Sequence, residues 1–209
     1  MMKQPNIVIT DYGVGNTNSV SNAIKYLGYK KLQISDDPAI IEQADVLILP
    51  GVGAFEEAIK NLEARNLVSI LNEEVINKGK PILGICVGMQ LLATESSEKG
   101  IHKGLNWIEG KVDKLDLSAE YAVPHVGWNN VIFDPSNPLF NLNDEEANFY
   151  FDHSYYFRCD HPENSVAQTK YDIDVTVAVQ KDNVFGVQFH PEKSQTSGLK
   201  LFRSFFNSI

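Results

Sequence analysis

A short apolar run that ends in a cysteine constrains the fold of this chain more than any other stretch. Residues 80–92 read Lys-Pro-Ile-Leu-Gly-Ile-Cys-Val-Gly-Met-Gln-Leu-Leu. The apolar residues before Cys86 predict a short strand that is buried on both faces, and the spacing of Met89, Leu91 and Leu92 predicts a helix after it. The cysteine is therefore expected at a sharp strand-to-helix turn.

Two glycines flank that cysteine. Gly84 and Gly88 stand two residues before and after Cys86, which gives the thiol form of the G-x-S-x-G nucleophile elbow, where larger side chains would crowd the turn. A cysteine at the start of a helix faces free backbone amides, which favour the thiolate and can also hold an oxyanion. The stretch predicts a nucleophilic cysteine, and a buried structural cysteine beside two packing glycines is the alternative.

Strand and helix patterns alternate through the first half of the chain. Short apolar runs are each followed by apolar residues at helical spacing, which predicts a parallel sheet with helices on both faces. Gly28 is expected to end the first helix, and Asp37 and Pro38 to open a short one as N-cap and first residue. Strands are expected at residues 6–10, 46–49 and 82–86, and helices at 20–27, 38–41, 55–62 and 67–75.

The pattern changes after Thr94 to short strands with short connections. Residues 96–100 are expected to form a surface loop, 149–157 a single strand, and 199–209 a terminal helix with an aromatic face. We therefore expect an α/β fold with a mostly parallel central sheet, helices on both faces and antiparallel strand additions in the second half. The remaining strands are expected at 111–115, 128–133, 165–169, 175–180 and 184–189, the last two joined by a turn at 181–183.

Composition limits the class of protein. A chain of 209 residues with 43% hydrophobic content suffices for one core, so residues 1–209 are expected to form a single domain. A net charge of −9 without a basic cluster disfavours nucleic acid as a partner. There is no apolar run long enough to cross a membrane and no signal-peptide core, so we expect a soluble, cytoplasmic protein. Cys86 and Cys159 could pair in principle, but nothing resembles the disulfide framework of small secreted domains.

A second informative stretch places a histidine at a predicted strand end. Residues 187–192 read Val-Gln-Phe-His-Pro-Glu. A thiol nucleophile needs a group that takes and returns protons, and that imidazole needs an acceptor to fix its tautomer. Cys86, His190 and Glu192 supply these roles, and the ends of parallel strands meet at one edge of a sheet. A surface turn is the alternative for the histidine.

Together, residues 84–90 and 189–192 resemble the class I glutamine amidotransferase family. The resemblance covers nearly the whole chain and implies a Cys86, His190 and Glu192 triad that hydrolyses glutamine through a glutamyl thioester. It also implies that backbone amides hold the oxyanion, one from Val87 and one from Val52 or Gly53. The residues that it places around the bound glutamine are Gly51, Gln90, His153, Ser154 and Tyr155.

Further stretches are similar to one branch of that family, the glutaminase subunits of imidazole glycerol phosphate synthase. They are residues 11–16, 50–53, 124–129, 153–156 and 192–194. This similarity implies a heterodimer with a (β/α)8 barrel cyclase that uses the ammonia to make imidazole glycerol phosphate and an aminoimidazole carboxamide ribotide in histidine biosynthesis. Asn16, Trp128 and Lys193 would face that partner, which would switch on a chain that is a poor glutaminase alone. We expect no cofactor.

Two alternatives remain open. Val87 stands where the family usually has leucine, and residues 103–110 are less typical, which leaves room for a paralogue that feeds ammonia to another synthase, such as one that amidinates a nucleotide-linked sugar. The second alternative is of a different class: a non-catalytic regulatory protein on the same fold.

The remaining histidines and Cys159 have simpler interpretations. His125 and His153 could each satisfy a backbone carbonyl, and since no Cys/His spacing indicates zinc, we expect no metal. His102 and His161 are expected in exposed loops, and Cys159 is expected to have no role.

Overall fold

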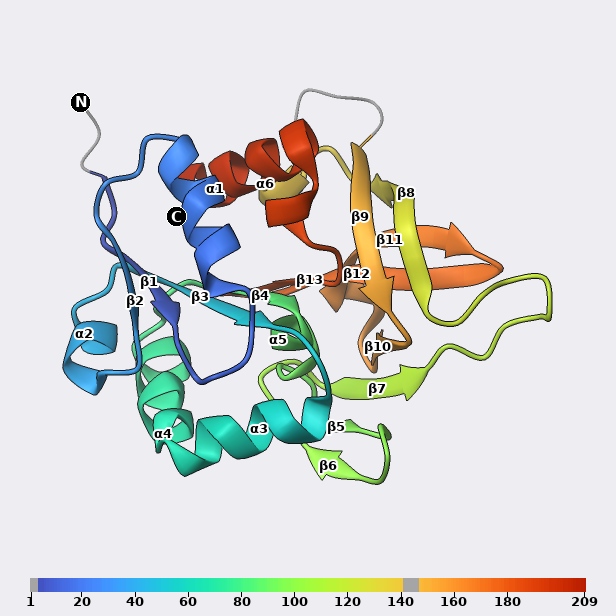
Figure 1. The fold of residues 1–209 in the computed structure, drawn as a ribbon, viewed down its shortest axis with the longest axis horizontal. Helices are drawn as coiled ribbons and strands as arrows, with labels where there is room; N and C mark the ends of the chain where they lie inside the picture. The colour runs from blue at the N-terminus through green and yellow to red at the C-terminus, as the bar shows by residue number, and fades with distance from the viewer. Residues whose placement is uncertain (1–3, 141–146) are drawn as a thin grey trace.

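The computed structural model describes residues 4–140 and 147–209 and builds them around two sheets (Figure 1). The larger has nine strands in the order β2-β1-β3-β4-β13-β12-β11-β8-β9, and the smaller has the order β10-β7-β5-β6. The strands are β1 (Ile7–Thr10), β2 (Leu32–Ser35), β3 (Val46–Gly51), β4 (Ile82–Cys86), β5 (Glu95–Ser96), β6 (His102–Lys103), β7 (Gly110–Lys114), β8 (His125–Phe133), β9 (Ala147–His153), β10 (Tyr155–Cys159), β11 (Ser165–Tyr171), β12 (Ile173–Lys181) and β13 (Val184–Val187).

The helices that cover the large sheet are near their expected positions. Helices α1 and α6 lie on one face and α3 and α4 on the other (Figure 1). Gly28 follows α1 with a positive φ of 91°, and Asp37 caps α2 by accepting from the amide of Ala39, both as predicted. The helices are α1 (Thr17–Tyr26), α2 (Pro38–Glu42), α3 (Phe55–Ala64), α4 (Leu67–Leu71), the π-helix η1 (Asn72–Asn77), α5 (Val87–Gln90), α6 (Gln195–Asn207), and the 3-10 turns η2 (Pro138–Phe140), η3 (Pro162–Asn164) and η4 (Pro191–Lys193).

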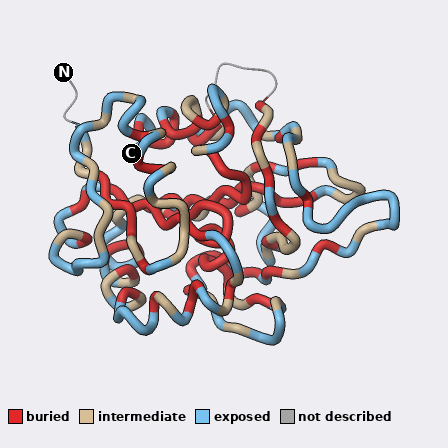
Figure 2. Tube along the Cα trace, viewed as in Figure 1, coloured by how far each residue is buried: buried red, intermediate tan, exposed pale blue. Residues whose placement is uncertain are grey.

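The parallel core holds the most deeply buried strands. Strands β1, β3 and β4 are buried along their whole length (Figure 2), because helices cover both faces. Strand β13 joins this core parallel to β4, and β12, β11, β8 and β9 follow in antiparallel pairs. The predicted α/β architecture is confirmed.

One strand of the parallel part was not predicted. Strand β2 pairs parallel to β1, with Leu32 opposite Ile7. It lies at the sheet edge and is nowhere fully buried, so it lacks the apolar run that identifies its neighbours.

The second half departs from prediction at two places. Residues 149–157 are not one strand, because the chain leaves the large sheet at Ser154: β9 pairs with β8, and β10 pairs with β7 in the small sheet. The expected surface loop at 96–100 begins inside a short hairpin, in which β5 pairs with β6. Both strands of that hairpin are two residues long, too short for a readable alternation.

The helix after Cys86 is shorter than predicted. Helix α5 ends at Gln90, because the next carbonyls receive hydrogen bonds from another segment. The amides of Leu105, Trp107 and Asn106 donate to the carbonyls of Leu91, Leu92 and Ala93. The atypical residues 103–110 thus pack against the end of the elbow, and Trp107 is buried there, its indole N–H donating to Asn72 Oδ1 at 2.6 Å.

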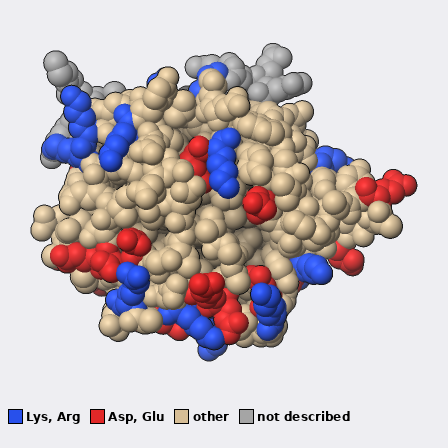
Figure 3. Space-filling model, viewed as in Figure 1, with Lys and Arg blue, Asp and Glu red and all other residues tan. Residues whose placement is uncertain are grey.

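The surface has mixed charge. On the face in Figure 3, acidic and basic side chains of the described residues alternate around a hollow without forming a broad basic area. No helix in the described ranges is both long and apolar enough to cross a membrane.

Candidate active site

Cys86 occupies a strained turn between β4 and α5. Its φ of 56° and ψ of −112° are costly for a residue with a side chain, by about 1–3 kcal/mol. A Cβ on Gly84 would lie 2.6 Å from the carbonyl oxygen of Gly88, and one on Gly88 would overlap the carbonyl of Leu49. The two glycines therefore allow the close approach of strand and helix that the sequence predicted.

His190 follows β13, the strand parallel to β4. The register, with Val187 opposite Ile85, brings His190 and Cys86 to the same sheet edge, where both line one cavity. One ring nitrogen of His190, Nδ1, lies 2.9 Å from Glu192 Oε1. Because a carboxylate only accepts, Nδ1 carries the proton and Nε2 is left for the thiol.

The backbone around His190 is held from both sides. Its amide donates to the carbonyl of Tyr150 at 2.9 Å, and its carbonyl accepts from the Ser194 hydroxyl at 2.6 Å. The same hydroxyl oxygen accepts from the amide of Tyr150 at 3.0 Å. These bonds tie η4 to β9 and fix where the imidazole ring projects.

The electrostatics of His190 favour the imidazolium. Burial alone would lower its pKa, but the interactions of the ring with Cys86 and Glu192 raise the pKa of His190 to about 10. The imidazolium is thus the favoured charge state of His190. A thiol beside such an imidazolium supplies a nucleophile for a carbonyl carbon and a proton for a leaving amine.

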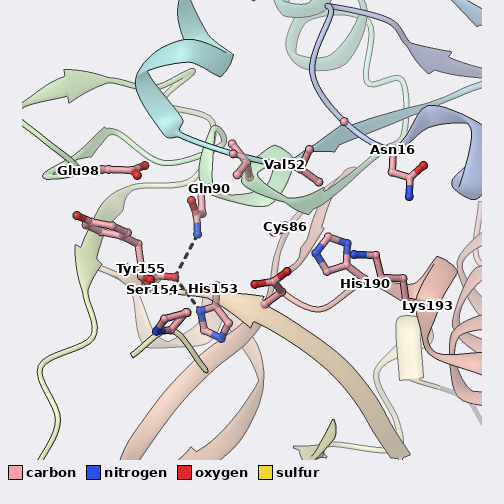
Figure 4. Close-up of a pocket in the computed structure, with 15 residues that line it drawn as sticks. Asn16, Val52, Cys86, Gln90, Glu98, His153, Ser154, Tyr155, His190 and Lys193 are labelled. Atoms are coloured by element: carbon pink, nitrogen blue, oxygen red, sulfur yellow. Dashed lines mark hydrogen bonds between the residues drawn. The ribbon is translucent and has the colours of Figure 1, made fainter. Parts of the chain in front are cut away.

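The Cys86 thiol opens into a cavity of about 660 Å³ (Figure 4). Its wall includes most of the residues singled out from the sequence, although they come from distant parts of the chain. Those residues are Asn16, Val52, Gly53, Cys86, Val87, Gln90, His153, Ser154, Tyr155, His190 and Lys193.

Three predicted site residues do not line the cavity. Gly51 lies in β3 opposite Cys86, where an added Cβ would be 2.7 Å from the Tyr12 hydroxyl. Glu192 lies behind His190 with its side chain 1% exposed. Trp128 is 46% exposed on β8, edge-on to the ring of Tyr150, so it is a surface rather than a core residue.

Glu98 is a cavity residue that the sequence analysis missed. Its Oε2 accepts from the amide of Phe55 at 2.8 Å, which caps the start of α3. The sequence held one signal: Ala54 stands at the N-cap position of α3 and has no side chain that can cap. The identity of the distant carboxylate that replaces it is not readable from local patterns. Gly15, Pro124 and Asp152 also line the cavity unpredicted.

Two further histidines form a pair in and behind the cavity wall. His153 Nδ1 lies 2.8 Å from the carbonyl oxygen of Tyr155, as one of the expected backbone contacts. His153 Nε2 lies 3.1 Å from His125 Nδ1. Burial lowers the pKa of His125 to about 4 and, together with the neighbouring histidines, that of His153 to about 3, so both rings are neutral at physiological pH.

The other titratable residues that the sequence analysis singled out are Cys159, His102 and His161. Cys86 and Cys159 are both free thiols, and burial raises the pKa of Cys159 to about 12. His161 is exposed and lies 2.6 Å from Glu109 Oε2. His102 is mostly covered within β6 rather than exposed in a loop. In the described part of the chain, no cluster of three or more His, Cys, Asp and Glu side chains could hold a metal ion.

The chain is similar in sequence to known proteins. The family model described as "Glutamine amidotransferase class-I" matches residues 8–209. The chain is 48% identical over 204 residues to "Imidazole glycerol phosphate synthase subunit HisH 2" of Vibrio vulnificus, covering 97% of this chain and 94% of that protein. It is 46% identical over 200 residues to "Imidazole glycerol phosphate synthase subunit HisH" of Listeria monocytogenes, covering 95% of this chain and 94% of the relative.

Solved structures share the fold at lower identity. The crystal structure of a glutamine amidotransferase superposes with a TM-score of 0.74 at 20% identity, over 96% of this chain and 97% of the other. The structure of PurLQS from Thermotoga maritima gives a TM-score of 0.73 at 20% identity and 99% coverage of both chains. At this identity the similarity concerns the fold.

Proposed function

The chain belongs to the class-I glutamine amidotransferase family, and from that premise we propose that it is the glutaminase subunit of an imidazole glycerol phosphate synthase. The observation that supports catalysis most directly is the alignment of Cys86, His190 and Glu192 at one sheet edge, with the thiol on a cavity wall. The names of relatives at 46% and 48% identity support the choice of synthase.

The proposed reaction runs in two steps. The Cys86 thiolate attacks the side-chain carbonyl carbon of glutamine, and the tetrahedral intermediate expels ammonia as the His190 imidazolium donates a proton to the nitrogen. The resulting glutamyl thioester is then attacked by water, whose proton returns to His190, so that glutamate leaves and the thiolate is restored. Glu192 keeps the ring oriented and stabilises its positive charge.

The cavity wall supplies groups for each end of glutamine. The amide of Val87 and an amide from Val52 or Gly53 are proposed to hold the oxyanion, and Gln90, His153, Ser154 and Tyr155 to surround the substrate. Glu98 adds a carboxylate that can take the α-ammonium group of glutamine. Gly51 contributes by packing β3 against the elbow rather than by lining the wall.

The proposed partner is a (β/α)8 barrel cyclase, and residues 1–209 are proposed to form a single glutamine amidotransferase domain that docks onto it. Asn16 and Lys193 lie at the cavity wall, and Lys193 Nζ lies 5.5 Å from the ring centroid of Tyr150, which also contacts Trp128. An exposed tryptophan and a lysine beside the cavity suit an interface through which ammonia passes without entering solvent.

The atypical segment 103–110 gives no support to the paralogue or to a non-catalytic protein. Trp107 is buried and bonded to Asn72, and neither residue lines the cavity that holds Cys86. The departure at 103–110 therefore concerns the packing behind the elbow and leaves the proposed chemistry unchanged.

The test uses the complex of this chain with its cyclase. Cys86→Ala should abolish glutamine-dependent formation of imidazole glycerol phosphate, while formation from added ammonium persists, because the thiol acts only in releasing nitrogen. Cys159→Ala is the matched control and should retain both activities. Glutamine hydrolysis by the Cys86→Ala complex, or equal loss with ammonium, would contradict the proposed role. Turnover only with a synthase that amidinates a sugar would establish the paralogue instead.

We further propose that the partner activates this chain through the loop after β3. If the resting loop presents a carbonyl to the oxyanion, loss of one donor costs on the order of 10²–10³ in rate. Gly53 has a φ of +89° and no atom within 4 Å of an added Cβ, so Gly53→Ala changes only the backbone preference. Gly51→Pro would not be a clean test, because Gly51 is packed within β3.

Glutamine turnover is compared for the chain alone, for the complex, and for the complex with its acceptor substrate. A stepwise rise that Gly53→Ala reduces would support activation through the loop. Equal rates in all three states would refute it.

A further inference from the structure

The first turn of α6 departs from local rules at three residues. Ser194 stands at the N-cap position, where a serine hydroxyl ordinarily accepts from an amide of the first turn, but its side chain caps no amide of this helix, every residue of which the structure describes. Gln195 has a φ of 48°, which is costly for a residue with a side chain. Gly198 lies so close to η4 that an added Cβ would overlap the Pro191 carbonyl. Such departures indicate that a requirement outside the helix fixes this turn.

The hydroxyl of Ser194 is used outside the helix instead. It donates to the carbonyl of His190 at 2.6 Å and accepts from the amide of Tyr150 at 3.0 Å. Because an amide N–H only donates and a carbonyl only accepts, the directions of both bonds are fixed. The amide of His190 donates in turn to the carbonyl of Tyr150 at 2.9 Å. The main chain of His190 is therefore tied to one residue of β9 twice, directly through its amide and through Ser194 at its carbonyl.

No other group in the described structure is placed to replace this hydroxyl. Ser194 and His190 are both almost fully buried, so solvent has no access to the two bonds. Strand β9 is the edge of the large sheet, so no further strand can accept from the Tyr150 amide. The carbonyl of His190 keeps a second bond, from the amide of Lys193 at 3.0 Å, but that bond lies within η4. Removing the hydroxyl would thus leave the turn intact and loosen its attachment to β9.

The attachment of this turn matters because it carries two of the groups in the proposed triad. His190 immediately precedes η4 and Glu192 lies within it, with His190 Nδ1 2.9 Å from Glu192 Oε1. The thiol of Cys86 is on a different strand, β4. If the turn moves, the two groups on it move together and their distance from Cys86 changes. A misplacement of about 1 Å can cost about 10²-fold in rate.

We propose that Ser194 is a positioning residue for the proton donor: its hydroxyl holds the turn after β13 against β9 and so sets where the His190 ring stands relative to Cys86. Helix α6 goes without an N-cap as a consequence. This inference rests on the proposed glutaminase function. Ser194 is not among the described residues that line the cavity, so it acts on the reaction only through His190.

Removal of the hydroxyl separates positioning from support of the fold. Ser194→Ala deletes both bonds with little change in volume. Thr169→Val is the matched control, because Thr169 is also buried and its hydroxyl donates to the carbonyl of Asn130 at 2.7 Å, between β11 and β8. Each substitution removes a buried hydroxyl that bonds to a main-chain carbonyl. If Ser194 only supports the fold, the two variants should lose stability and keep the same kcat.

The experiment measures kcat and KM for glutamine in the complex with the cyclase, below the unfolding temperature of each variant, with ammonium-dependent synthesis as the control for folding and docking. Positioning predicts that Ser194→Ala lowers kcat by about tenfold to hundredfold and leaves KM within about twofold, because the proton donor acts in the chemical step. Thr169→Val should keep both constants within about twofold. An unchanged kcat in Ser194→Ala, or equal losses of kcat in the two variants, would overturn the inference.

A second substitution keeps the test valid if Ser194→Ala is poorly folded. Glycine adopts a positive φ without the cost that Gln195 bears, so Ser194→Ala combined with Gln195→Gly should unfold at a higher denaturant concentration than Ser194→Ala alone. Positioning predicts that kcat stays low in the combined variant although stability rises. Recovery of kcat together with stability would overturn the inference. Absence of glutamine hydrolysis in the complex with the unsubstituted chain would instead refute the proposed function.

Discussion

Histidines lie in or behind the wall on two sides of the cavity. They differ in charge although they are almost equally buried. His190 is 2% exposed, His153 6% and His125 3%. Yet the pKa of His190 is raised to about 10, while those of His153 and His125 are lowered to about 3 and 4. His190 faces a thiol and a carboxylate, whereas the other two face each other, a carbonyl and aromatic rings.

The comparison shows that the partner, rather than burial, decides what a histidine can do here. Burial removes water from all three rings and by itself favours the neutral form. Only an anionic partner reverses this, and such partners stand on the β13 side. One side of the cavity can therefore donate protons, and the other can only hold orientation through fixed tautomers.

The largest expected effect comes from substituting asparagine on each side in turn. His190→Asn should reduce kcat/KM for glutamine by about 10³-fold or more, because the general acid and base is lost. His153→Asn should cost at most about tenfold, because its Nδ2–H can still reach the Tyr155 carbonyl. Both are measured in the complex, with ammonium-dependent synthesis as the control for folding and docking. Similar losses in both variants would remove the functional distinction between the sides.

The next effect concerns the carboxylate that makes His190 different. Glu192→Gln removes the negative charge, so the pKa of His190 should fall from about 10 toward that of an ordinary histidine. The alkaline limb of the kcat profile, where the imidazolium proton is lost, should then move toward neutral pH, with kcat reduced by about 10²-fold. A pH profile of the same shape as that of the unchanged complex would show that Glu192 does not set this charge.

The histidines on the two sides of the cavity should make the free energy of unfolding change with pH in opposite directions. His125 has a folded pKa of about 4, below its unfolded value, so its contribution is present above about pH 6.5 and is lost as pH falls toward 4. The loss is on the order of 3 kcal/mol. His190 has a folded pKa of about 10, above its unfolded value, so its contribution is present below about pH 6.5 and is lost as pH rises toward 10.

Denaturant unfolding from pH 4 to 10 measures these slopes by difference. His125→Phe should flatten the acid side relative to the unchanged chain, and His190→Asn the alkaline side. If each variant only lowers stability by the same amount at every pH, the assigned charge states are wrong.

The smallest expected effect is a change in stability caused by backbone strain on each side of the cavity. Cys86 holds a φ of 56°, and Gly127, which follows His125 closely in β8, holds a φ of +128°. Cys86→Gly should be more stable than Cys86→Ala by about 1 kcal/mol, although glycine ordinarily weakens a strand. Gly127→Ala should lose about 1 kcal/mol from strain alone, since an added Cβ there meets no atom within 4 Å. Unfolding free energies of the three variants are compared; Cys86→Gly less stable than Cys86→Ala would contradict a strained elbow.

The sequence could predict one side of the cavity far better than the other. The elbow at Cys86 and the His-Pro-Glu turn are local patterns, because β4 and β13 are short apolar runs whose ends meet through parallel pairing. The histidine pair depends on the antiparallel register of β8 and β9, which sets His125 opposite His153, and no local pattern specifies that register. The prediction of one strand over residues 149–157 is wrong for the same reason: the apolar alternation continues through Ser154, where the chain changes sheets.

Glu98 and Gln188 show a second limit of sequence reasoning. Both act through partners that are far away in the chain, Glu98 on Phe55 and Gln188 on Gln90 and Cys86. Polar residues in a short hairpin and in a buried strand end carry no signal of such partners until the fold brings them together.

The difference in charge between the two sides can be measured directly by nitrogen NMR of the histidine rings at pH 7, with His190, His153 and His125 assigned from single substitutions. The predicted spectrum has protons on both ring nitrogens of His190 and a neutral ring protonated only at Nδ1 in His153 and in His125. A neutral His190, or a charged His153, would contradict the conclusion that the anionic partners on the β13 side make His190 the proton donor of this cavity.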